Sequence, residues 1–480
     1  MSLNINLAAM FAKRDLTSGS IPKNILATTL PLWIGSLVYS AFWAMDIYWI
    51  SRLGSEAIAA VAIGGCGLML FWTMLIGVSN ATIAMVGNLA GGKDIKGTNR
   101  LAKEILTITF LLCLALAIIG YLATPGLLAL LRAEAEVLTL AIPYLRIVIV
   151  GGIISFPIFV INAMLRGSGD MRLPMFIVCG ELILNAILDP LFILGIGVPE
   201  MGVSGAAVAS VITGATGTAV GLWILVKGKS TIKINLTKDI RSYLPRFSTA
   251  KEVISLVGPN TVETLGISII GLVMMGFVAI WGTYALAAYG IGLRLLMIAS
   301  MAGFDLATTS AIMMSNNLGA KKIRRAETSS WIASGFNMLI MGVIGIILFC
   351  LASQIVGIFD KTADVVTIGT QFLRITTPGW LFLAVWTVLR RAFIGAKDVK
   401  TPLFISLFTL AGLRLPLAFY LPKVAGIGAA GIWWAILGTI VIQGIISASL
   451  FRVGKWKPKG TPIAGEASGN PLMPNNQTKV

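Results

Sequence analysis

Two acidic side chains, Asp46 and Asp189, lie inside long apolar stretches of the chain. A charged side chain at the centre of a bilayer costs at least ~2.5 kcal/mol on insertion scales, so such residues are candidates for function. Asn185 precedes Asp189 by four residues, and Glu181 precedes Asn185 by four, which places all three on one face of a helix. Carboxylate and amide oxygens together can bind a hard cation such as Na⁺, and carboxylates can also bind protons.

Two further oxygen donors are expected at a similar depth in the first half of the chain. If successive apolar stretches cross a membrane in alternating directions, Asp46 and Asp189 lie toward the outer ends of outward-running helices. Tyr144 and Ser210 then lie about two turns into inward-running helices. We therefore predict a cation site at Asp46, Asn185, Asp189, Ser210 and Tyr144, for either Na⁺ or H⁺. The alternative is that the two acids only tie helices together through hydrogen bonds.

Membrane-spanning helices are the elements that position these residues. Hydrophobic residues make up 57% of the chain, and charged residues make up 12%, against ~25% in soluble domains. Apolar stretches of ~20 residues, the length that crosses a bilayer as a helix, recur along the chain. We predict twelve spans, at residues 26–50, 56–80, 100–123, 137–165, 172–196, 203–227, 252–279, 284–315, 328–350, 364–392, 402–421 and 427–450.

Basic residues outnumber acidic ones by 37 to 20, and their positions indicate membrane topology rather than nucleic-acid binding. Most of them lie at the two termini and in the connections that follow even-numbered spans. The connections on the opposite side hold Arg52, Arg132, Lys361 and Lys423. The positive-inside rule then predicts a multi-pass protein of the cell membrane, either inner or plasma membrane, with both termini in the cytoplasm.

An internal repeat divides the chain into two similar halves. A shift of 228 residues brings the halves into register, without a gap as far as residue 190. Matched pairs include Pro31 with Pro259, Gly54 with Gly282, Asn88 with Asn316, Gly91 with Gly319, Lys93 with Lys321, Gly167 with Gly395 and Asp170 with Asp398. Six spans per copy is an even number, so both copies enter the membrane in the same direction, and a pseudo-two-fold axis along the membrane normal should relate them.

The predicted architecture is therefore an all-α polytopic membrane protein with twelve transmembrane helices in two six-helix bundles. Its parts are a cytoplasmic N-terminal segment (1–22), an N-terminal bundle (23–227), a basic cytoplasmic linker (228–251), a C-terminal bundle (252–452) and a disordered cytoplasmic tail (453–480). Two similar bundles that face each other enclose a cavity at their interface, and rocking would expose this cavity to each side in turn.

Pro31 lies inside the predicted first span, fifteen residues before Asp46. A proline inside a helix removes one backbone hydrogen bond and permits a kink. We predict that Pro31 is a hinge through which the first helix responds to the state of Asp46. A static kink is the alternative.

The second half repeats the proline but not the acids, because Asp46, Asn185 and Asp189 fall on Met274, Leu413 and Leu417. Its own charges inside the predicted spans are Glu263, Arg294, Asp305, Arg374 and Arg414. We predict that several of these pair with each other in a structural network, and a substrate-facing role is the alternative. Glu181, Glu263, Arg294 and Asp305 are therefore secondary candidates for the functional site.

The residues do not indicate an enzyme or a cofactor. Histidine is absent, and the four cysteines, Cys66, Cys113, Cys179 and Cys350, fall within predicted spans without metal-ligand spacing. No nucleophile with an adjacent base is visible. The expected partners are small organic molecules and membrane lipids, not nucleic acid, and the chain is expected to act as a monomer.

From roughly residue 22 to residue 452 the sequence resembles the multidrug and toxic compound extrusion transporters, in particular the branch similar to the DNA-damage-inducible F proteins of bacteria and archaea. The resemblance is carried by Pro31, by Ala44-Met45-Asp46-Ile47-Tyr48-Trp49-Ile50 with Leu53-Gly54, by Leu165-Arg166-Gly167-Ser168-Gly169-Asp170, by Asn185-Ala186-Ile187-Leu188-Asp189-Pro190 and by Gly202-Val203-Ser204-Gly205-Ala206-Ala207. It implies export of amphipathic, often cationic compounds in exchange for H⁺ or Na⁺. It also implies a cation site at Asp46, Asn185, Asp189 and Ser210, with Tyr144 beside it.

Two positions depart from the family's pattern. Ser210 stands where threonine is common, which keeps the hydroxyl group. Glu263 lies about one turn closer to the start of its helix than the cation-binding glutamate of another branch, and the tenth span lacks the partnering aspartate. A flippase for a lipid-linked saccharide is the alternative function, favoured by Arg294, Arg374 and Arg414.

Overall fold

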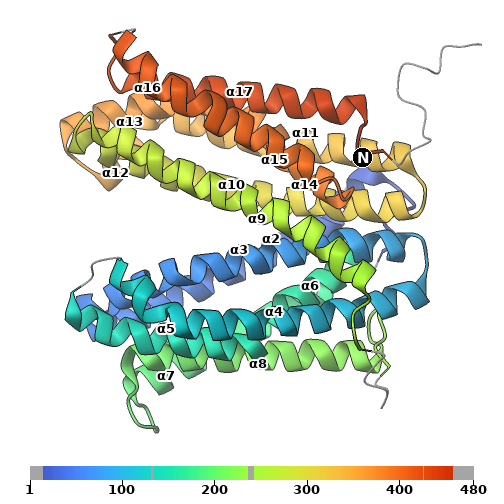
Figure 1. Ribbon diagram of the computed structural model, residues 1–480. Coiled ribbons are helices and arrows are strands. Elements are labelled where there is room, and N and C mark those ends of the chain that lie inside the picture. Colours follow the sequence, from blue (N-terminus) through green and yellow to red (C-terminus); the bar gives the residue numbers. More distant parts are fainter. Residues whose placement is uncertain (1–13, 131–133, 236–242, 425, 458–480) are drawn as a thin grey trace, which may run out of the picture.

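The computed structural model describes residues 14–130, 134–235, 243–424 and 426–457, and the regular elements in these ranges are helices (Figure 1). Twelve helical segments of the described chain are long and apolar enough to cross a membrane. The all-α fold class with twelve spans is thus confirmed. The predicted tail beyond residue 457, the first 13 residues and linker residues 236–242 lie outside the described residues.

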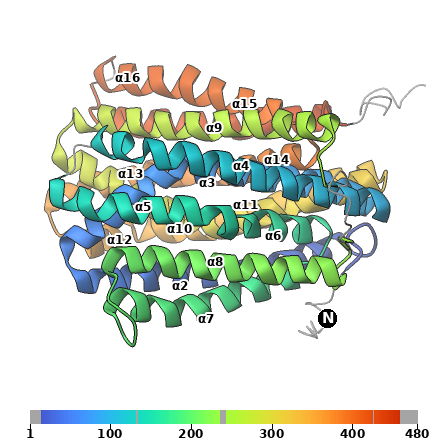
Figure 2. The same cartoon turned by 60° about the horizontal axis from the view of Figure 1, so that its bottom comes forward.

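The first half of the chain forms one helical bundle, coloured blue to green in Figures 1 and 2. Its elements are α2 (Ile21–Ile50), the 3-10 turn η1 (Ser51–Leu53), α3 (Ser55–Gly91), α4 (Ile95–Leu130), α5 (Ala135–Ser155), α6 (Pro157–Gly167), α7 (Arg172–Leu194) and α8 (Gly202–Lys227). The helices of this bundle run roughly along one common direction, which is the expected arrangement for a set of membrane spans (Figure 2).

The second half forms the other bundle, coloured lime to red in Figure 1. Its elements are α9 (Phe247–Ala279), α10 (Thr283–Gly319), α11 (Ile323–Cys350), α12 (Ala352–Phe359), α13 (Ala363–Thr376), η3 (Thr377–Gly379), α14 (Trp380–Gly395), α15 (Lys400–Ser406), the π-helical η4 (Leu407–Arg414), α16 (Leu415–Val424) and α17 (Ala430–Val453). The two bundles meet toward the right of Figure 1 and diverge toward the left.

Three spans that were predicted as single helices are interrupted. The span 137–165 divides into α5 and α6 at Phe156, and 364–392 divides around η3. The span 402–421 contains the π-helical η4. A proline lies at or just after each interruption, at Pro157, Pro378 and Pro416. Proline cannot donate the backbone hydrogen bond of a helix and its ring clashes with the preceding turn, so the local helix geometry changes there.

The 228-residue repeat is also visible in the backbone. Gly54 and Gly282, directly before α3 and α10, have φ angles of 102° and 100°. Lys93 and Lys321, in the turns that follow the same two helices, have φ angles of 59° and 58°. Left-handed backbone is uncommon for a residue with a side chain. Its recurrence at matched lysines therefore shows that the two copies share their turns as well as their helices.

The two bundles come into their closest contact where α3 and α10 end. A methyl group on Gly91 would overlap the backbone carbonyl oxygen of Asn316, and one on Gly319 would overlap that of Asn88. The two contacts are equivalent under the repeat, so the pseudo-two-fold axis passes between them. Only glycine lets two helix backbones approach this closely. We call the end of the molecule that holds Gly91 and Gly319 the closed end.

The segment before α2 is attached to the C-terminal bundle at the closed end. The carbonyl oxygen of Thr17 accepts a hydrogen bond of 2.8 Å from Lys322. Arg325 donates to the carbonyl oxygens of Ser18 at 2.7 Å and Gly19 at 2.8 Å. These bonds fix the entry of α2 against the start of α11.

Side chains at Gly91 or Gly319 should destabilise the protein. We expect Gly91→Ala and Gly319→Ala each to lower the free energy of unfolding by about 1–3 kcal/mol, because the added methyl group has to push two backbones apart. Thermal unfolding of the purified protein in detergent measures this effect.

Gly65 in α3 and Gly290 in α10 are matched controls, since a methyl group at either position meets nothing within 4 Å. Gly65→Ala and Gly290→Ala should leave the unfolding temperature unchanged or raise it slightly. Equal effects at all four glycines would contradict the proposed role of the close contact.

Candidate functional site

The amide and carboxylate predicted on one face of α7 do meet. Asn185 donates a hydrogen bond of 2.9 Å from Nδ2 to Oδ1 of Asp189, and both side chains are fully buried. The four-residue spacing accounts for this contact, because it brings side chains one helical turn apart onto the same face. Asn185 Oδ1 and Asp189 Oδ2 are buried and accept no hydrogen bond from the described residues.

Asp46 reaches the same site from α2, which packs against α7. Its side chain is buried, with 9% of the residue exposed, and its Oδ1 atom has no hydrogen-bond partner among the described residues. Asp46 and Asp189 are close enough to interact electrostatically. The two carboxylates, which are 143 positions apart (189 − 46), therefore share one site.

Tyr144 enters the site from α5. Its ring lies against Gly64 of α3, where a Cβ atom would come within 2.7 Å of the ring. Tyr144 interacts electrostatically with both Asp46 and Asp189. The structure thus brings together four of the five predicted residues, and Gly64 supplies the space that the phenol ring needs.

Ser210, the fifth predicted residue, is half-buried on α8, and the structure gives no hydrogen bond from it to the acids. Thr213 follows one turn later on the same helix and is buried, and its Oγ1 atom has no partner among the described residues. The sequence analysis missed Thr213. A second hydroxyl three positions after Ser210 was the signal that could have identified it.

Glu181, one turn before Asn185 on α7, continues the polar stripe. Its carboxylate lies against Gly217 of α8 and would overlap any side chain placed there. It also interacts electrostatically with Tyr39 of α2. Its Oε1 atom is buried without a hydrogen-bond partner in the described part of the chain. Glu181 therefore extends the same polar region by one turn.

Several buried side-chain oxygens of this region therefore have no hydrogen-bond partner among the described residues, namely Asp46 Oδ1, Glu181 Oε1, Asn185 Oδ1, Asp189 Oδ2 and Thr213 Oγ1. A buried acceptor without a partner costs about 1–3 kcal/mol, and a charged one costs more. A proton on a carboxylate or a hard cation between the oxygens would remove this cost. Within the described ranges no three His, Cys, Asp or Glu side chains group to hold a metal ion, so Na⁺ would need the Asn185 amide and a hydroxyl besides the carboxylates.

Comparison with known proteins gives two matches to one family model, MatE, at residues 31–191 and 259–420. Together the matches cover more than half of the chain, and their starting points are 228 residues apart (259 − 31), the offset of the internal repeat.

The chain belongs to the MATE family of transporters. Members of this family are transporters rather than enzymes. A probable multidrug resistance protein, YoeA of Bacillus subtilis, is 25% identical over 443 residues, which cover 92% of this chain and 95% of that protein. The probable multidrug resistance protein NorM of Thermotoga maritima is 25% identical over 446 residues, covering 92% and 94%.

Solved structures show the same fold. A transporter of the MOP superfamily from Pyrococcus furiosus superposes with a TM-score of 0.82 at 22% identity, covering 91% of this chain and 96% of that one. A structure described as the outward-facing conformation of a multidrug resistance MATE family transporter gives the same TM-score and identity, covering 92% and 97%.

In this MATE transporter Asp305 lies near the interface of the bundles rather than at the cation site. From α10 it interacts with Ser36 of α2, and its charge interacts with Arg166 of α6 and Arg391 of α14. Arg391 also hydrogen-bonds the side chain of Asn80 on α3, in the opposite bundle. Asp305 is therefore one member of a polar cluster that connects the bundles.

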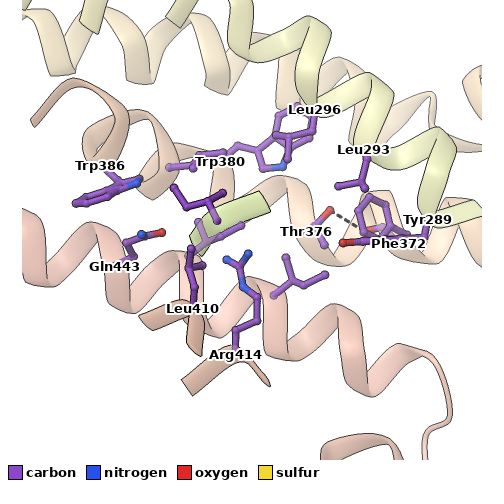
Figure 3. Close-up of a pocket in the computed structure, with 14 residues that line it drawn as sticks. Tyr289, Leu293, Leu296, Phe372, Thr376, Trp380, Trp386, Leu410, Arg414 and Gln443 are labelled. Atoms are coloured by element: carbon purple, nitrogen blue, oxygen red, sulfur yellow. Dashed lines mark hydrogen bonds between the residues drawn. The ribbon is translucent and has the colours of Figure 1, made fainter. Parts of the chain in front are cut away.

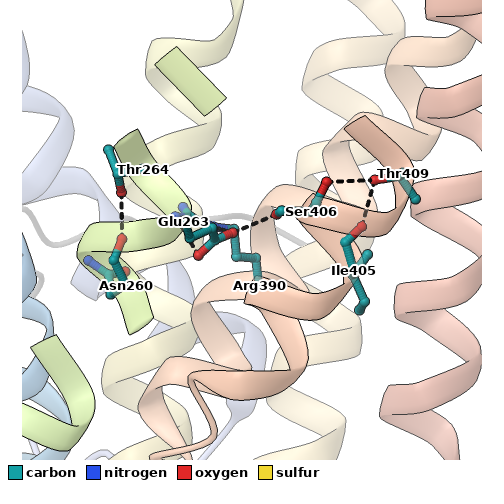
Figure 4. Close-up of polar contacts among 7 residues, drawn as sticks. All are labelled: Asn260, Glu263, Thr264, Arg390, Ile405, Ser406 and Thr409. Carbon is teal, nitrogen blue, oxygen red and sulfur yellow. Dashed lines mark hydrogen bonds and ion pairs between the residues drawn. The ribbon is translucent and has the colours of Figure 1, made fainter. Parts of the chain in front are cut away.

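Glu263 is held in a complete ion pair within the C-terminal bundle (Figure 4). Arg390 donates to both of its oxygens, at 2.7 Å and 3.0 Å, and Ser406 donates to Oε1 at 2.7 Å. Glu263 is 1% exposed, so these bonds occupy a carboxylate that water does not reach. The arrangement favours a structural role over cation binding.

The prediction that the charged residues of the second half pair with each other is wrong, because the partners that they do have are other residues. Glu263 pairs with Arg390, which the sequence analysis did not name. Arg294 and Arg374 are exposed, and neither makes an ion pair with the described residues. Pairing across helices depends on their mutual rotation, which hydropathy does not specify.

Breaking the Glu263 ion pair should destabilise the MATE fold. We expect Arg390→Gln to lower the free energy of unfolding by about 3–5 kcal/mol, because it leaves a buried carboxylate without its partner. Arg294→Gln, which removes an exposed arginine from the same bundle, is the control and should change stability by less than about 0.5 kcal/mol. Thermal unfolding with the two variants side by side measures the difference, and equal stability would contradict the structural role of Glu263.

Proposed function

We propose that this protein is a secondary active antiporter that exports amphipathic, often cationic organic compounds in exchange for H⁺ or Na⁺. The observation that carries the proposal is the pair of interacting carboxylates, Asp46 and Asp189, each of which has a buried oxygen without a hydrogen-bond partner among the described residues. Binding of a cation or a proton would stabilise these buried oxygens. A coupling ion has to bind one conformation better than the other, and here the site is made by two separate helices, α2 and α7.

Helix α2 is suited to couple this site to the opposite bundle. Near its start, Thr29 hydrogen-bonds Thr309 of α10 at 2.9 Å, and Trp33 donates to the carbonyl oxygen of Ala302 at 3.0 Å. Pro31 lies between these two anchors, and Asp46 lies near the other end of the same continuous helix. A change at Asp46 can therefore reach the C-terminal bundle through α2, with Pro31 as the hinge.

The orientation in the membrane is part of the proposal. Lys93 and Lys321 lie in the turns at the closed end, and Lys322 and Arg325 bind the N-terminal segment there. The positive-inside rule puts this end in the cytoplasm together with both termini, so the ends of the bundles that diverge in Figure 1 would face the outside of a cell membrane.

The proposal extends to the branch of the family, the class of substrate and the oligomeric state. We place the chain in the branch similar to the DNA-damage-inducible F proteins, because its uncompensated acids lie in the N-terminal bundle while Glu263 of the C-terminal bundle is paired. The relatives described as probable multidrug resistance proteins support organic compounds as the exported substrates. The proposed unit of function is the monomer, since one chain supplies both bundles.

Neutralising either acid should stop transport without unfolding the protein. In liposomes with an imposed proton or sodium gradient, applied separately, Asp46→Asn and Asp189→Asn should each abolish gradient-driven efflux of a cationic dye. Each variant should unfold at or above the temperature of the unchanged protein, because a buried uncompensated charge is removed. The gradient that drives the unchanged protein identifies the coupling ion.

Glu56→Gln is the control for this experiment, since Glu56 is an exposed acid in the first turn of α3. It should transport at the normal rate. Full transport by both Asp variants would refute the site. Scrambling of a labelled lipid by the same liposomes, without dye exchange, would favour the flippase alternative.

Replacing Pro31 should slow the conformational cycle. Pro31→Ala restores a backbone donor inside α2 and stiffens the helix, so we expect dye binding to persist while the transport rate falls at least about threefold. Pro143→Ala in α5 is the matched control, because Pro143 also lies inside a helix of the same bundle but is exposed. Equal transport rates for Pro31→Ala and Pro143→Ala would show that Pro31 does not act as a hinge.

A further inference from the structure

A cavity of ≈ 190 Å³ lies inside the C-terminal bundle, between α9, α10, α13, α14, η4 and α17 (Figure 3). Its wall is mainly aromatic and aliphatic, and its rings include those of Phe372, Trp380 and Trp386. Its polar groups are those of Tyr289, Thr376, Arg414 and Gln443, and Tyr289 interacts electrostatically with Arg414. Arg414 is the one residue of this lining that carries a permanent charge.

The local backbone directs Arg414 into this space. Arg414 is the last residue of the π-helical η4, two positions before Pro416. Because Pro416 cannot donate to the turn before it, the helix widens there, and π-helical turns frequently occur at functional sites. In Figure 3 the guanidinium group points toward the space bounded by Leu410, Trp380 and Thr376.

The guanidinium of Arg414 has one fixed hydrogen bond and no counter-ion. Its Nε atom donates to Oγ1 of Thr439 at 2.9 Å. No carboxylate among the described residues forms an ion pair with it, whereas Arg390 of the same bundle is fully paired with Glu263. Arg414 lies near the middle of the span Lys400–Lys423. An arginine at that depth without an anion is costly, and it keeps donors free for a ligand.

The repeat relates one wall of this cavity to the cation site of the other bundle. Phe372 corresponds to Tyr144 (372 − 144 = 228), and each ring fills the space left by a matched glycine, Gly292 for Phe372 and Gly64 for Tyr144. The acid Asp46, however, corresponds to the buried apolar Met274. The bundle that lacks the acids therefore has an arginine close to the matched ring instead.

We propose that the cavity binds the anionic group of an amphipathic organic molecule, with its carboxylate or sulfonate on Arg414 and its apolar body among the aromatic rings. A guanidinium group binds a planar carboxylate through two parallel hydrogen bonds, and the amide of Gln443 adds a neutral donor. The cavity is smaller than the roughly 300–1,000 Å³ of sites for drug-sized ligands, so it holds one or two fused rings and their anionic group.

This inference goes beyond the proposed exchange of cationic compounds, because it adds an anion-binding site in the bundle that does not hold the coupling acids. Zwitterionic and anionic amphiphiles become ligands of the protein. The same chemistry can come from a free aromatic acid or from a fatty acid of the membrane, and the aromatic wall favours the former.

Binding of matched ligands to the full chain in phosphatidylcholine nanodiscs tests the proposal by calorimetry. The probes are 2-naphthoate, the neutral 2-naphthamide and the cationic 2-naphthylmethylammonium. We expect 2-naphthoate to bind at one saturable site, at least about tenfold more tightly than either of the others. Arg414→Gln should weaken 2-naphthoate binding by at least about tenfold, to the level of 2-naphthamide.

Arg374→Gln, at an exposed arginine of the same bundle, is the control and should leave the affinity for 2-naphthoate unchanged. Equal affinities of the three probes for the unchanged protein would overturn the proposal even if Arg414→Gln failed to fold. So would tight 2-naphthoate binding by folded Arg414→Gln. Competition by decanoate at the Arg414-dependent site would identify a fatty acid as the occupant, and failure to compete would identify a free aromatic acid.

The Asp46→Asn and Asp189→Asn variants separate this inference from the proposed antiport. Both should bind 2-naphthoate normally, because neither residue lines the cavity. Loss of 2-naphthoate binding in these variants would show that the anion site is not independent and would contradict the assignment to the C-terminal bundle.

Discussion

The backbones of α3 and α10 approach each other at Gly91 and Gly319 without an intervening side chain, and the arrangement of the two bundles depends on this contact. Each glycine faces the backbone of the matched Asn in the other copy, so the same surface is used twice around the pseudo-two-fold axis. In lipid, where apolar side chains gain little by leaving the solvent, close packing of this kind is a main source of helix association. A contact that uses backbone alone can also open without breaking a charged pair.

The two bundles share one backbone fold, but their buried charges differ. The N-terminal bundle concentrates unpartnered acidic oxygens between α2, α5 and α7, whereas the cavity of the C-terminal bundle is lined by Arg414 and aromatic rings. A buried charge that lacks a partner destabilises the protein on its own, and it persists where a mobile ligand supplies the missing charge. By contrast, the pair of Glu263 and Arg390 is complete and holds α9 against α14.

Much of this fold follows from the sequence, for identifiable physical reasons. Hydropathy locates the spans because a bilayer requires long apolar helices, and the fixed offset of 228 residues locates the two bundles. Asn185 and Asp189 could be paired from their spacing alone, since that contact lies within one helix. The partner of Glu263 could not be predicted, because it depends on how α9 and α14 are rotated against each other. The π-helical turn before Pro416 could not be predicted either, because a π-helical turn leaves the hydropathy of the span unchanged.

The continuity of α2 through Pro31 has a mechanical consequence. Fifteen residues separate Pro31 from Asp46, which is about 22 Å along a helix. On a lever of that length, a bend of about 10° displaces the carboxylate of Asp46 by about 4 Å, more than the length of a hydrogen bond. The oxygens from α2 and those from α7 can therefore form one cation site only in a narrow range of bend angles at Pro31. The affinity of the site for an ion then depends on how far α2 is bent.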